Sequence, residues 1–275
     1  MKMMRPAFWM VLFFVVTGFG DGMRDDVYMP VKNESFLRGE TLEFKMTVGF
    51  FTVGRGMANI APERFRINGR DCYKVDVFGK TVGLVNWVKD IDDQWGAYID
   101  TSALVPHRFY RKIREGSYRK DEVTYFNHEQ KKISVKVSDK KTGKFKEPVI
   151  YDAPAQVRDM IGGFLYLRTM DLSNLKVKDT IMVTGFFEDE FYRLPIVYQG
   201  KKTIKTRIGR IRTLAFKPMM PDNKIFNGKN SVTAYFSDDK NRIPVKIEAE
   251  MFVGNAGVEL TDFSGLRNPL NIVHR

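Results

Sequence analysis

The chain has 275 residues, of which 43% are hydrophobic and 13% aromatic, which is enough apolar material for one large domain or two small ones. Lysine and arginine outnumber aspartate and glutamate by 45 to 33. The single cysteine, Cys72, excludes an intrachain disulfide and a cysteine-based zinc cluster, and the three histidines lie far apart in the sequence. The composition therefore excludes a disulfide scaffold, a collagen, a coiled coil and a polytopic membrane protein, and we expect no metal and no cofactor.

Residues 1–20 have the pattern of a secretory signal peptide. Lys2 and Arg5 precede the apolar run 7–16, and Gly18 and Gly20 provide the small residues of a cleavage site. The run has ten residues, about half of the ~20 that span a bilayer. We therefore expect cleavage after Gly20 rather than an uncleaved anchor helix, and export to the periplasm of a Gram-negative bacterium. No cysteine follows the run, so we do not expect a lipoprotein, and we expect no membrane span in the mature chain.

From residue 41 onward, alternation of apolar and polar residues with a period of two predicts half-buried strands. The regular ones before residue 150 cover 41–48, 73–77 and 133–137, and less regular ones cover 56–61, 92–99, 108–114 and 122–126. Turn residues separate them, at 51–54, Asn68–Gly69, 127–130 and 139–143. Short connections of this kind are typical of antiparallel strands.

One helix is predicted, over 156–170. Its apolar residues recur at helical spacing, and Asp152 or Asp159 can accept hydrogen bonds from the free amides at its start. Gly162 and Gly163 lie inside this segment and are tolerated where a backbone must approach another element closely. We expect the helix to pack against the sheet through its apolar stripe.

Strands resume after the helix. Regular alternation covers 232–236 and 245–251, and weaker patterns cover 181–187, 192–198, 203–206, 211–217 and 258–263. Turns are predicted at Gln199–Gly200, 238–241 and 254–257. A dozen antiparallel strands rarely form one flat sheet. The prediction is a mainly β fold, with a large strongly curved antiparallel sheet or an incomplete barrel and one packed helix.

The domain plan follows from these elements. A signal peptide covers 1–20, an extended segment 21–35, a single β-rich domain 36–265 and a C-terminal tail 266–275. Two β-rich halves joined by the helix 156–170 are the alternative within the domain.

The order of several short motifs resembles a family of exported bacterial proteins known as domain of unknown function 3108. The resemblance covers about residues 36–265, and the ending with Asn268-Pro-Leu is similar to members from Bacteroides-type bacteria. The motifs are 36–44, 53–56, 88–92, 104–109, 159–168, 209–218 and 236–245. The resemblance implies a mainly antiparallel β fold and export. It implies no activity and no catalytic residues.

Acidic residues gather at Asp90, Asp92 and Asp93. Paired carboxylates there could serve a glycan hydrolase as acid and base or hold calcium, and solvated carboxylates near the start of a strand are the simpler interpretation. The chain contains neither a G-x-S-x-G nucleophile motif nor a phosphate-binding loop. We therefore do not expect an enzyme.

Basic side chains form two stretches. Arg108, Tyr110, Lys112 and Arg114 share one face of a predicted strand, and Arg210 and Arg212 follow Arg207 in another. If the two strands were neighbours, these side chains would form a surface for phosphate or carboxylate groups. A solvated outer face with scattered salt bridges is the alternative.

The curved sheet suggests a second binding feature. Its concave face would be either a filled core or an apolar cleft, and Trp87 and Trp95 would line the mouth of that cleft or belong to the core.

The favoured function combines these features. It is non-enzymatic binding of an amphipathic or anionic envelope component, such as a lipid, a lipopolysaccharide or an acidic glycan, with an apolar groove for chains and basic side chains for the head. The alternative is an adaptor that binds an envelope protein through a strand edge. Nucleic acid is not an expected partner of an exported chain.

Overall fold

A single antiparallel sheet contains every strand that the structure describes. The computed structural model describes residues 27–83, 90–219, 231–251 and 254–273; the predicted signal peptide and Trp87 lie outside these ranges. Before the helix α2 (Met160–Thr169) the strands are β1 (Thr41–Val48), β2 (Phe51–Ile60), β3 (Phe65–Ile67), β4 (Arg70–Thr81), β5 (Asp92–Asp100), β6 (Pro106–Glu115), β7 (Tyr118–Asn127), β8 (Lys132–Val137) and β9 (Val149–Asp152). After it they are β10 (Thr180–Phe187), β11 (Glu190–Thr206), β12 (Gly209–Pro218), β13 (Val232–Ser237), β14 (Pro244–Met251) and β15 (Gly254–Ser264).

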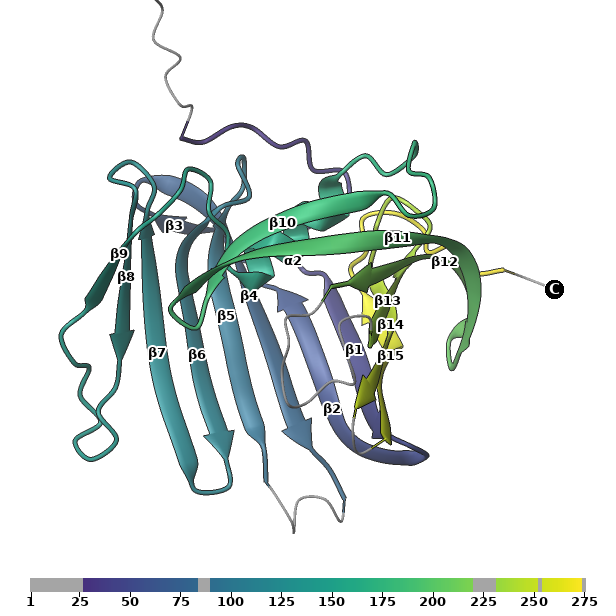
Figure 1. The fold of residues 1–275 in the computed structure, drawn as a ribbon, viewed down its shortest axis with the longest axis horizontal. Coiled ribbons are helices and arrows are strands. Elements are labelled where there is room, and N and C mark those ends of the chain that lie inside the picture. Colours follow the sequence, from purple (N-terminus) through teal and green to yellow (C-terminus); the bar gives the residue numbers. More distant parts are fainter. Residues whose placement is uncertain (1–26, 84–89, 220–230, 252–253, 274–275) are drawn as a thin grey trace, which may run out of the picture.

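The two halves of the chain join through β1 and β15. The order across the sheet is β10-β11-β12-β13-β14-β15-β1-β2-β4-β5-β6-β7-β8-β9, with β3 paired to β4 alone. Fifteen twisted strands cannot stay flat, and Figure 1 shows the sheet bending so that β10 and β11 cross over the upper part of β4 to β7. The described strands β9 and β10 are the two edges and do not pair with each other. The predicted incomplete barrel with one packed helix is therefore confirmed.

Helix α2 packs inside the bend of the sheet. Of the two candidates Asp152 and Asp159, Asp159 is its N-cap, and its side chain accepts a hydrogen bond of 2.6 Å from the amide of Gly162. Ile161 and Leu165 are buried together with side chains of β2, β4 and β5, including Ile60. We call the sheet face toward α2 the inner face and the opposite one the outer face. The tight approach at Gly162, where an added Cβ would lie 3.3 Å from Ile99 Cδ1, explains a glycine inside the helix.

The tip of the β10–β11 hairpin closes the open side of the bend through side chains. Phe187 stacks on Trp95 of β5, with ring centroids 5.6 Å apart and planes at 24°. Glu188 accepts a hydrogen bond of 2.9 Å from the Arg111 guanidinium of β6. Side-chain packing thus takes the place of the backbone ladder that would complete a barrel.

Three turns were predicted at the wrong positions. The reversal between β1 and β2 is at Gly49 (φ 57°) and Phe50, not at 51–54, because Phe51 already pairs with Val48. Gln199–Gly200 is a bulge inside the continuous strand β11, where Gly200 has φ 96°. Residues 254–257 belong to β15 and pair with β14. Each error has one cause: glycine marks bulges and close contacts in strands as well as turns.

Neither β3 nor β9 was predicted from the sequence. No helix of the described ranges has the length and apolar character to cross a membrane.

Candidate functional site

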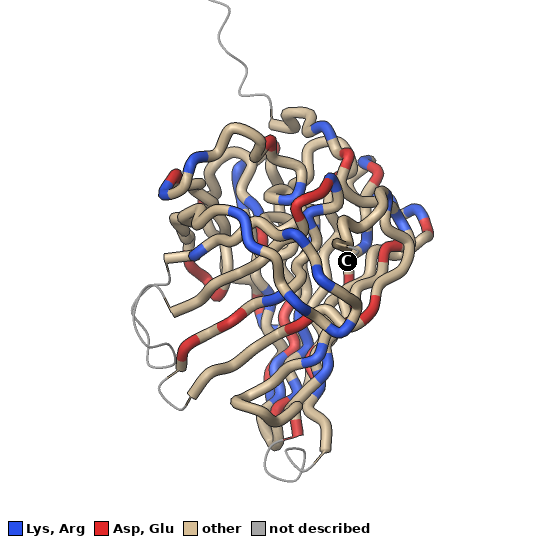
Figure 2. The backbone as a smooth tube through the Cα atoms, turned by 90° about the vertical axis from the view of Figure 1, so that its right-hand side faces the viewer, with Lys and Arg blue, Asp and Glu red and all other residues tan. Residues whose placement is uncertain are grey.

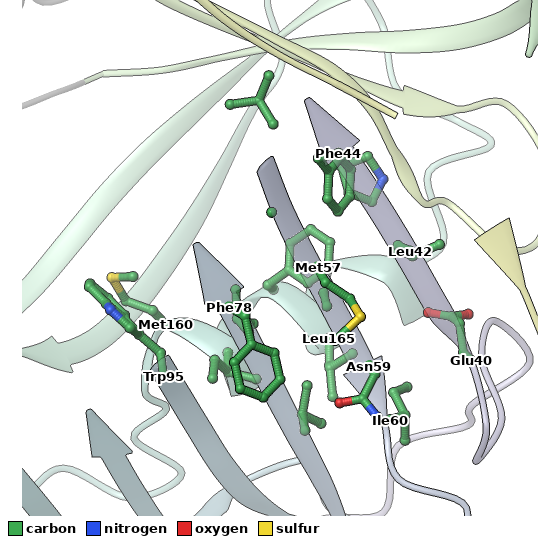
Figure 3. A pocket seen from close by; sticks show the side chains of 18 of the residues that line it. Glu40, Leu42, Phe44, Met57, Asn59, Ile60, Phe78, Trp95, Met160 and Leu165 are labelled. Carbon is green, nitrogen blue, oxygen red and sulfur yellow. The ribbon is translucent and has the colours of Figure 1, made fainter. Parts of the chain in front are cut away.

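An apolar cavity of about 390 Å³ lies between α2 and the inner face of the sheet. Strand register explains its lining, because residues directly opposite each other in paired strands point to the same face. Leu42, Ala58, Val77 and Trp95 form one such row across β1, β2, β4 and β5. Figure 3 shows the row from β1 to Trp95 with Met160 and Leu165 of the helix beside it. Inner-facing apolar side chains from β1, β2, β4 and β5, together with residues of β14 and β15, therefore form one wall, and α2 forms the other.

The cavity reaches solvent at one end. Val77 and Met160 line it and remain 36% and 46% exposed. Both are large apolar side chains whose burial would be favourable. An unfilled mouth of this kind is typical of a binding site rather than of a closed core.

Three glycines of β2 and β4 leave room for the side chain of Met46. Gly54, Gly56 and Gly79 lie on the inner face, where the methionine side chain covers them. A Cβ at Gly56 would lie 3.0 Å from Met46 Cε and one at Gly79 would lie 3.6 Å from it. Methionine is flexible and adapts to irregular apolar surfaces, so this part of the wall can adjust to what it contacts.

A buried ion pair closes the other end. The guanidinium of Arg168 donates to both carboxylate oxygens of Glu40, at 2.6 and 2.8 Å. Arg168 Nε donates to the carbonyl of Asn241 at 2.9 Å, and the side chains of Arg168 and Glu40 are 1% and 3% exposed. The three residues come from three of the motifs that carry the family resemblance. Because the charges are mutually satisfied, they offer no free head-group site inside the cavity.

A smaller cavity of about 160 Å³ lies beyond Arg168, between the end of α2 and β10 to β13. The ring contact of Phe164 with Phe236, with centroids 5.9 Å apart, lies between the helix and β13. Phe164 lines the larger cavity and Phe236 the smaller one. The helix therefore has apolar space on two sides.

The two predicted basic stretches are not brought together. Arg108, Tyr110, Lys112 and Arg114 do share one face of β6, and this is the outer face. Arg210 and Arg212 lie on β12, which is separated from β6 by the strands β13, β14, β15, β1, β2, β4 and β5. Lysine and arginine interleave with acidic residues along the chain (Figure 2). Of the two predicted tryptophans, Trp95 lines the cavity and Trp87 lies outside the described residues.

The outer face of β6 is engaged in contacts within the sheet. The Tyr110 hydroxyl donates a hydrogen bond to Asp76, and its ring lies across Gly96, where a Cβ would overlap with it. Burial and the neighbouring Asp76 carboxylate raise the pKa of Tyr110. The Arg108 guanidinium lies 5.6 to 5.8 Å from the ring centroids of Tyr98, Tyr110 and Tyr125. These contacts stabilise the sheet and leave Lys112 as the exposed cation of the row.

The structure places Asp92 and Asp93 of the acidic cluster on opposite faces of β5. Asp92 is opposite Lys80 and faces outward, whereas its neighbour Asp93 points to the inner face. Asp93 Oδ1 accepts a hydrogen bond of 2.8 Å from the amide of Arg114. Asp90 is exposed before β5 begins. Across the described ranges, no group of three or more His, Cys, Asp or Glu side chains is placed to hold a metal ion.

A buried polar network lies near the connection of β5 and β6, and sequence reasoning missed it. Asp100 Oδ1 accepts from the Ser102 amide and hydroxyl and from the Ala103 amide, at 2.7 to 2.8 Å. Its other oxygen is paired with Arg70 and lies 3.4 Å from His107 Nε2. These hydrogen bonds outweigh desolvation and keep the pKa of Asp100 well below its usual value. Both oxygens of the Asp100 carboxylate therefore have partners, and they stabilise the connection between β5 and β6.

The outer face also has a basic groove that sequence reasoning did not identify. Lys45, Arg55 and Lys80 are opposite one another across β1, β2 and β4. Together with Arg207 they line a groove of about 750 Å³, whose lining also includes the acidic residues Glu43, Asp92 and Asp262. It lies behind the apolar cavity, on the other side of the same strands. One ligand cannot occupy both through the sheet. Register across strands far apart in the sequence creates this groove, so no local pattern signals it.

The family match agrees with this architecture. The family described as "Protein of unknown function (DUF3108)" matches residues 43–261. The chain belongs to this family. A search of the curated proteins finds no match.

Among solved structures, the chain is similar to a β-barrel-like protein of domain of unknown function DUF1849 from Brucella abortus. The identity is 11% and the TM-score 0.53, over 84% of this chain and 98% of that one; this likeness shows the fold alone. A hypothetical protein from Chlamydia trachomatis matches with 7% identity and a TM-score of 0.36, over 88% of this chain and 94% of that one. An inferred exported protein with a YmcC-like fold from Bacteroides fragilis matches with 8% identity and a TM-score of 0.35, over 86% and 99%.

Proposed function

We propose that this DUF3108 protein is an exported, non-enzymatic protein that binds the apolar chain of an envelope amphiphile in the cavity beside α2. The observation that carries the proposal is the 390 Å³ cavity with apolar walls and a mouth at Val77 and Met160. Ligand sites are usually apolar concavities of about 300 to 1,000 Å³. The proposal of export rests on the basic, apolar and small-residue pattern of residues 1–20.

The head of such a ligand stays at the mouth in this proposal. The buried cation of the cavity, Arg168, is neutralised by Glu40, and the outer basic groove lies behind the sheet. The protein therefore selects ligands by their apolar chain, and ligands with different head groups bind with similar affinity. This replaces the sequence-based hypothesis that basic side chains of β6 and β12 hold the head.

The test is a titration of delipidated protein with a fluorescent fatty acid such as cis-parinaric acid. Saturable binding is expected, weakened about tenfold or more by Val77→Trp, which fills the mouth, or by Ala58→Phe, which fills the wall. Val149→Trp is the matched control, because Val149 is 54% exposed on β9 and does not line the cavity. Absence of saturable binding, or equal affinity of all variants with unchanged circular dichroism, contradicts the proposal.

One observation favours the adaptor alternative. The edge strand β9 exposes Val149 and Ile150 at 54% each, and an open edge can pair with a strand of another protein. Ile150→Pro would then abolish co-purification of a stoichiometric envelope protein and leave fatty-acid binding unchanged.

A further inference from the structure

The β1–β2 hairpin ends in exposed aromatic side chains. Phe50 is fully exposed, Phe51 is 77% exposed, and Val48 beside them is 37% exposed. Residues 46–54 carry no charged side chain. Large aromatic residues are seldom left this exposed on a rigid tip, because their burial is worth more than that of most side chains.

The tip is held in place by the sheet. Val48 pairs with Phe51 on one side and with Ala256 of β15 on the other. The Gly49 amide donates a hydrogen bond of 2.8 Å to the carbonyl of Asn255. Strands on both sides extend to the end of β1, so the phenylalanines cannot fold back onto the protein without breaking ladder hydrogen bonds. Figure 1 shows this hairpin at the lower end of the sheet, opposite the end where α2 connects to β10.

Basic side chains lie one step behind the apolar tip. Lys45 and Arg55 are opposite each other and are the first charged residues on the two strands, followed by Lys80 on β4. Lys45 is three residues from Val48, which is roughly 10 Å along a strand. Arg55 and Lys80 are exposed, and no ion pair joins either of them to a described acidic residue. Acidic side chains also lie near this row: Lys45 is paired with Glu259 at 3.3 Å, and Asp92 is opposite Lys80. Nearer the tip, Glu250 is opposite Asn255.

We propose that this tip docks on an anionic lipid bilayer. An interfacial segment buries its apolar side chains about 5 to 10 Å deep, while basic side chains reach the head groups. Insertion of Phe50 and Phe51 to that depth brings the row of Lys45, Arg55 and Lys80 to head-group level. The charge of the row is complementary to an anionic leaflet, and the formal net charge, +12 for the full chain and +10 without residues 1–20, acts in the same direction. The docking stands on the tip alone and does not require the cavity to bind a chain.

Phe50→Trp provides a local probe in the full chain, so that binding through other segments does not interfere. Its fluorescence should shift to the blue and be quenched by brominated lipid in vesicles of phosphatidylcholine with phosphatidylglycerol, and less so in phosphatidylcholine alone. The matched control is Val177→Trp, because Val177 is 59% exposed in the connection from α2 to β10, at the opposite end. No shift is expected there.

Affinity is measured by vesicle flotation of separate variants. Phe50→Ser and Phe51→Ser should each weaken binding by about tenfold, Arg55→Gln with Lys80→Gln should weaken it in a salt-dependent way, and Glu250→Gln should strengthen it. Because these side chains are exposed, the variants keep the circular dichroism of the parent.

Equal quenching at positions 50 and 177 would overturn the proposal. So would an unchanged affinity of the serine variants, or dimerisation through the tip without vesicle binding. Titration with cis-parinaric acid in solution, without vesicles, separates this outcome from failure of the cavity proposal.

Discussion

The N-cap carboxyl of α2 should make the stability of this protein fall as the pH rises through neutrality. Asp159 is 3% exposed. One oxygen accepts from the Gly162 amide, while Oδ2 is buried without a hydrogen-bond partner among the described residues. Burial disfavours the charged form and raises the pKa of Asp159 to about 7, although the amides of Gly162 and Ile161 oppose this shift.

The magnitude follows from linkage. The unfolded-state pKa of Asp159 is 3.8, so the folded protein binds a proton more tightly between pH 3.8 and about 7. The stabilisation is complete below pH 3.8 and is lost as the pH rises through about 7. Three pKa units correspond to about 4 kcal/mol in the free energy of unfolding. Replacement by asparagine keeps the accepting oxygen and removes the titration.

Urea unfolding of the wild type and of Asp159→Asn at pH 4.5, 6, 7 and 8 measures this effect. The difference in free energy of unfolding between the two proteins should change by a few kcal/mol across that range, with the wild type losing stability toward pH 8. Taking the difference cancels the titration of all other groups. A difference that stays constant with pH would refute the reasoning.

Three further outcomes are expected. Glu40→Gln leaves the Arg168 cation buried without its counter-charge and should lower the free energy of unfolding in urea by about 3 to 5 kcal/mol. The control is Asp152→Asn, at an exposed pair with Lys132, which should change the free energy of unfolding little. Equal effects of the two substitutions would contradict a stabilising role of the buried ion pair. Gly96→Ala pushes against the Tyr110 ring and should cost about 1 to 3 kcal/mol, with non-additivity in a double-mutant cycle with Tyr110→Ala as the check. Burial raises the pKa of the Cys72 thiol to about 11, so it should react with a disulfide reagent only after unfolding; rapid modification of the native protein at pH 7 would show the thiol to be accessible.

Local patterns predicted the parts of this fold that depend on local chemistry. Period-two alternation identified Thr41–Val48 as a strand because its apolar residues Leu42, Phe44 and Met46 share one face and line the cavity. The Asn68–Gly69 turn was predicted because both residues adopt positive φ there, 51° and 74°. The N-cap role of Asp159 follows from the same kind of short-range hydrogen bonding.

The features that the sequence could not predict depend on the pairing of strands that lie far apart in the chain. The row of Lys45, Arg55 and Lys80 joins residues from β1, β2 and β4, and its members become neighbours only when those strands pair. The sequence could not decide whether Arg108 and Arg212 meet, and they do not, because β6 and β12 lie in opposite halves of the sheet order. The sequence left Trp95 either at the mouth of a cleft or in the core; in the structure it lines the cavity and packs against the core cluster, because its strand position sets its face.

The cavity and the hairpin tip belong to one continuous apolar surface. Met46 is opposite Val258, and Val48 is opposite Ala256, so apolar pairs continue along β1 and β15 from the cavity to the tip. At the other end the Arg168–Glu40 pair closes the cavity. A chain leaving a bilayer under the tip would therefore remain in contact with apolar side chains until it reached the cavity, whereas entry past Arg168 would require separation of a buried ion pair. The buried ion pair therefore favours entry from the side on which Val77 and Met160 are exposed.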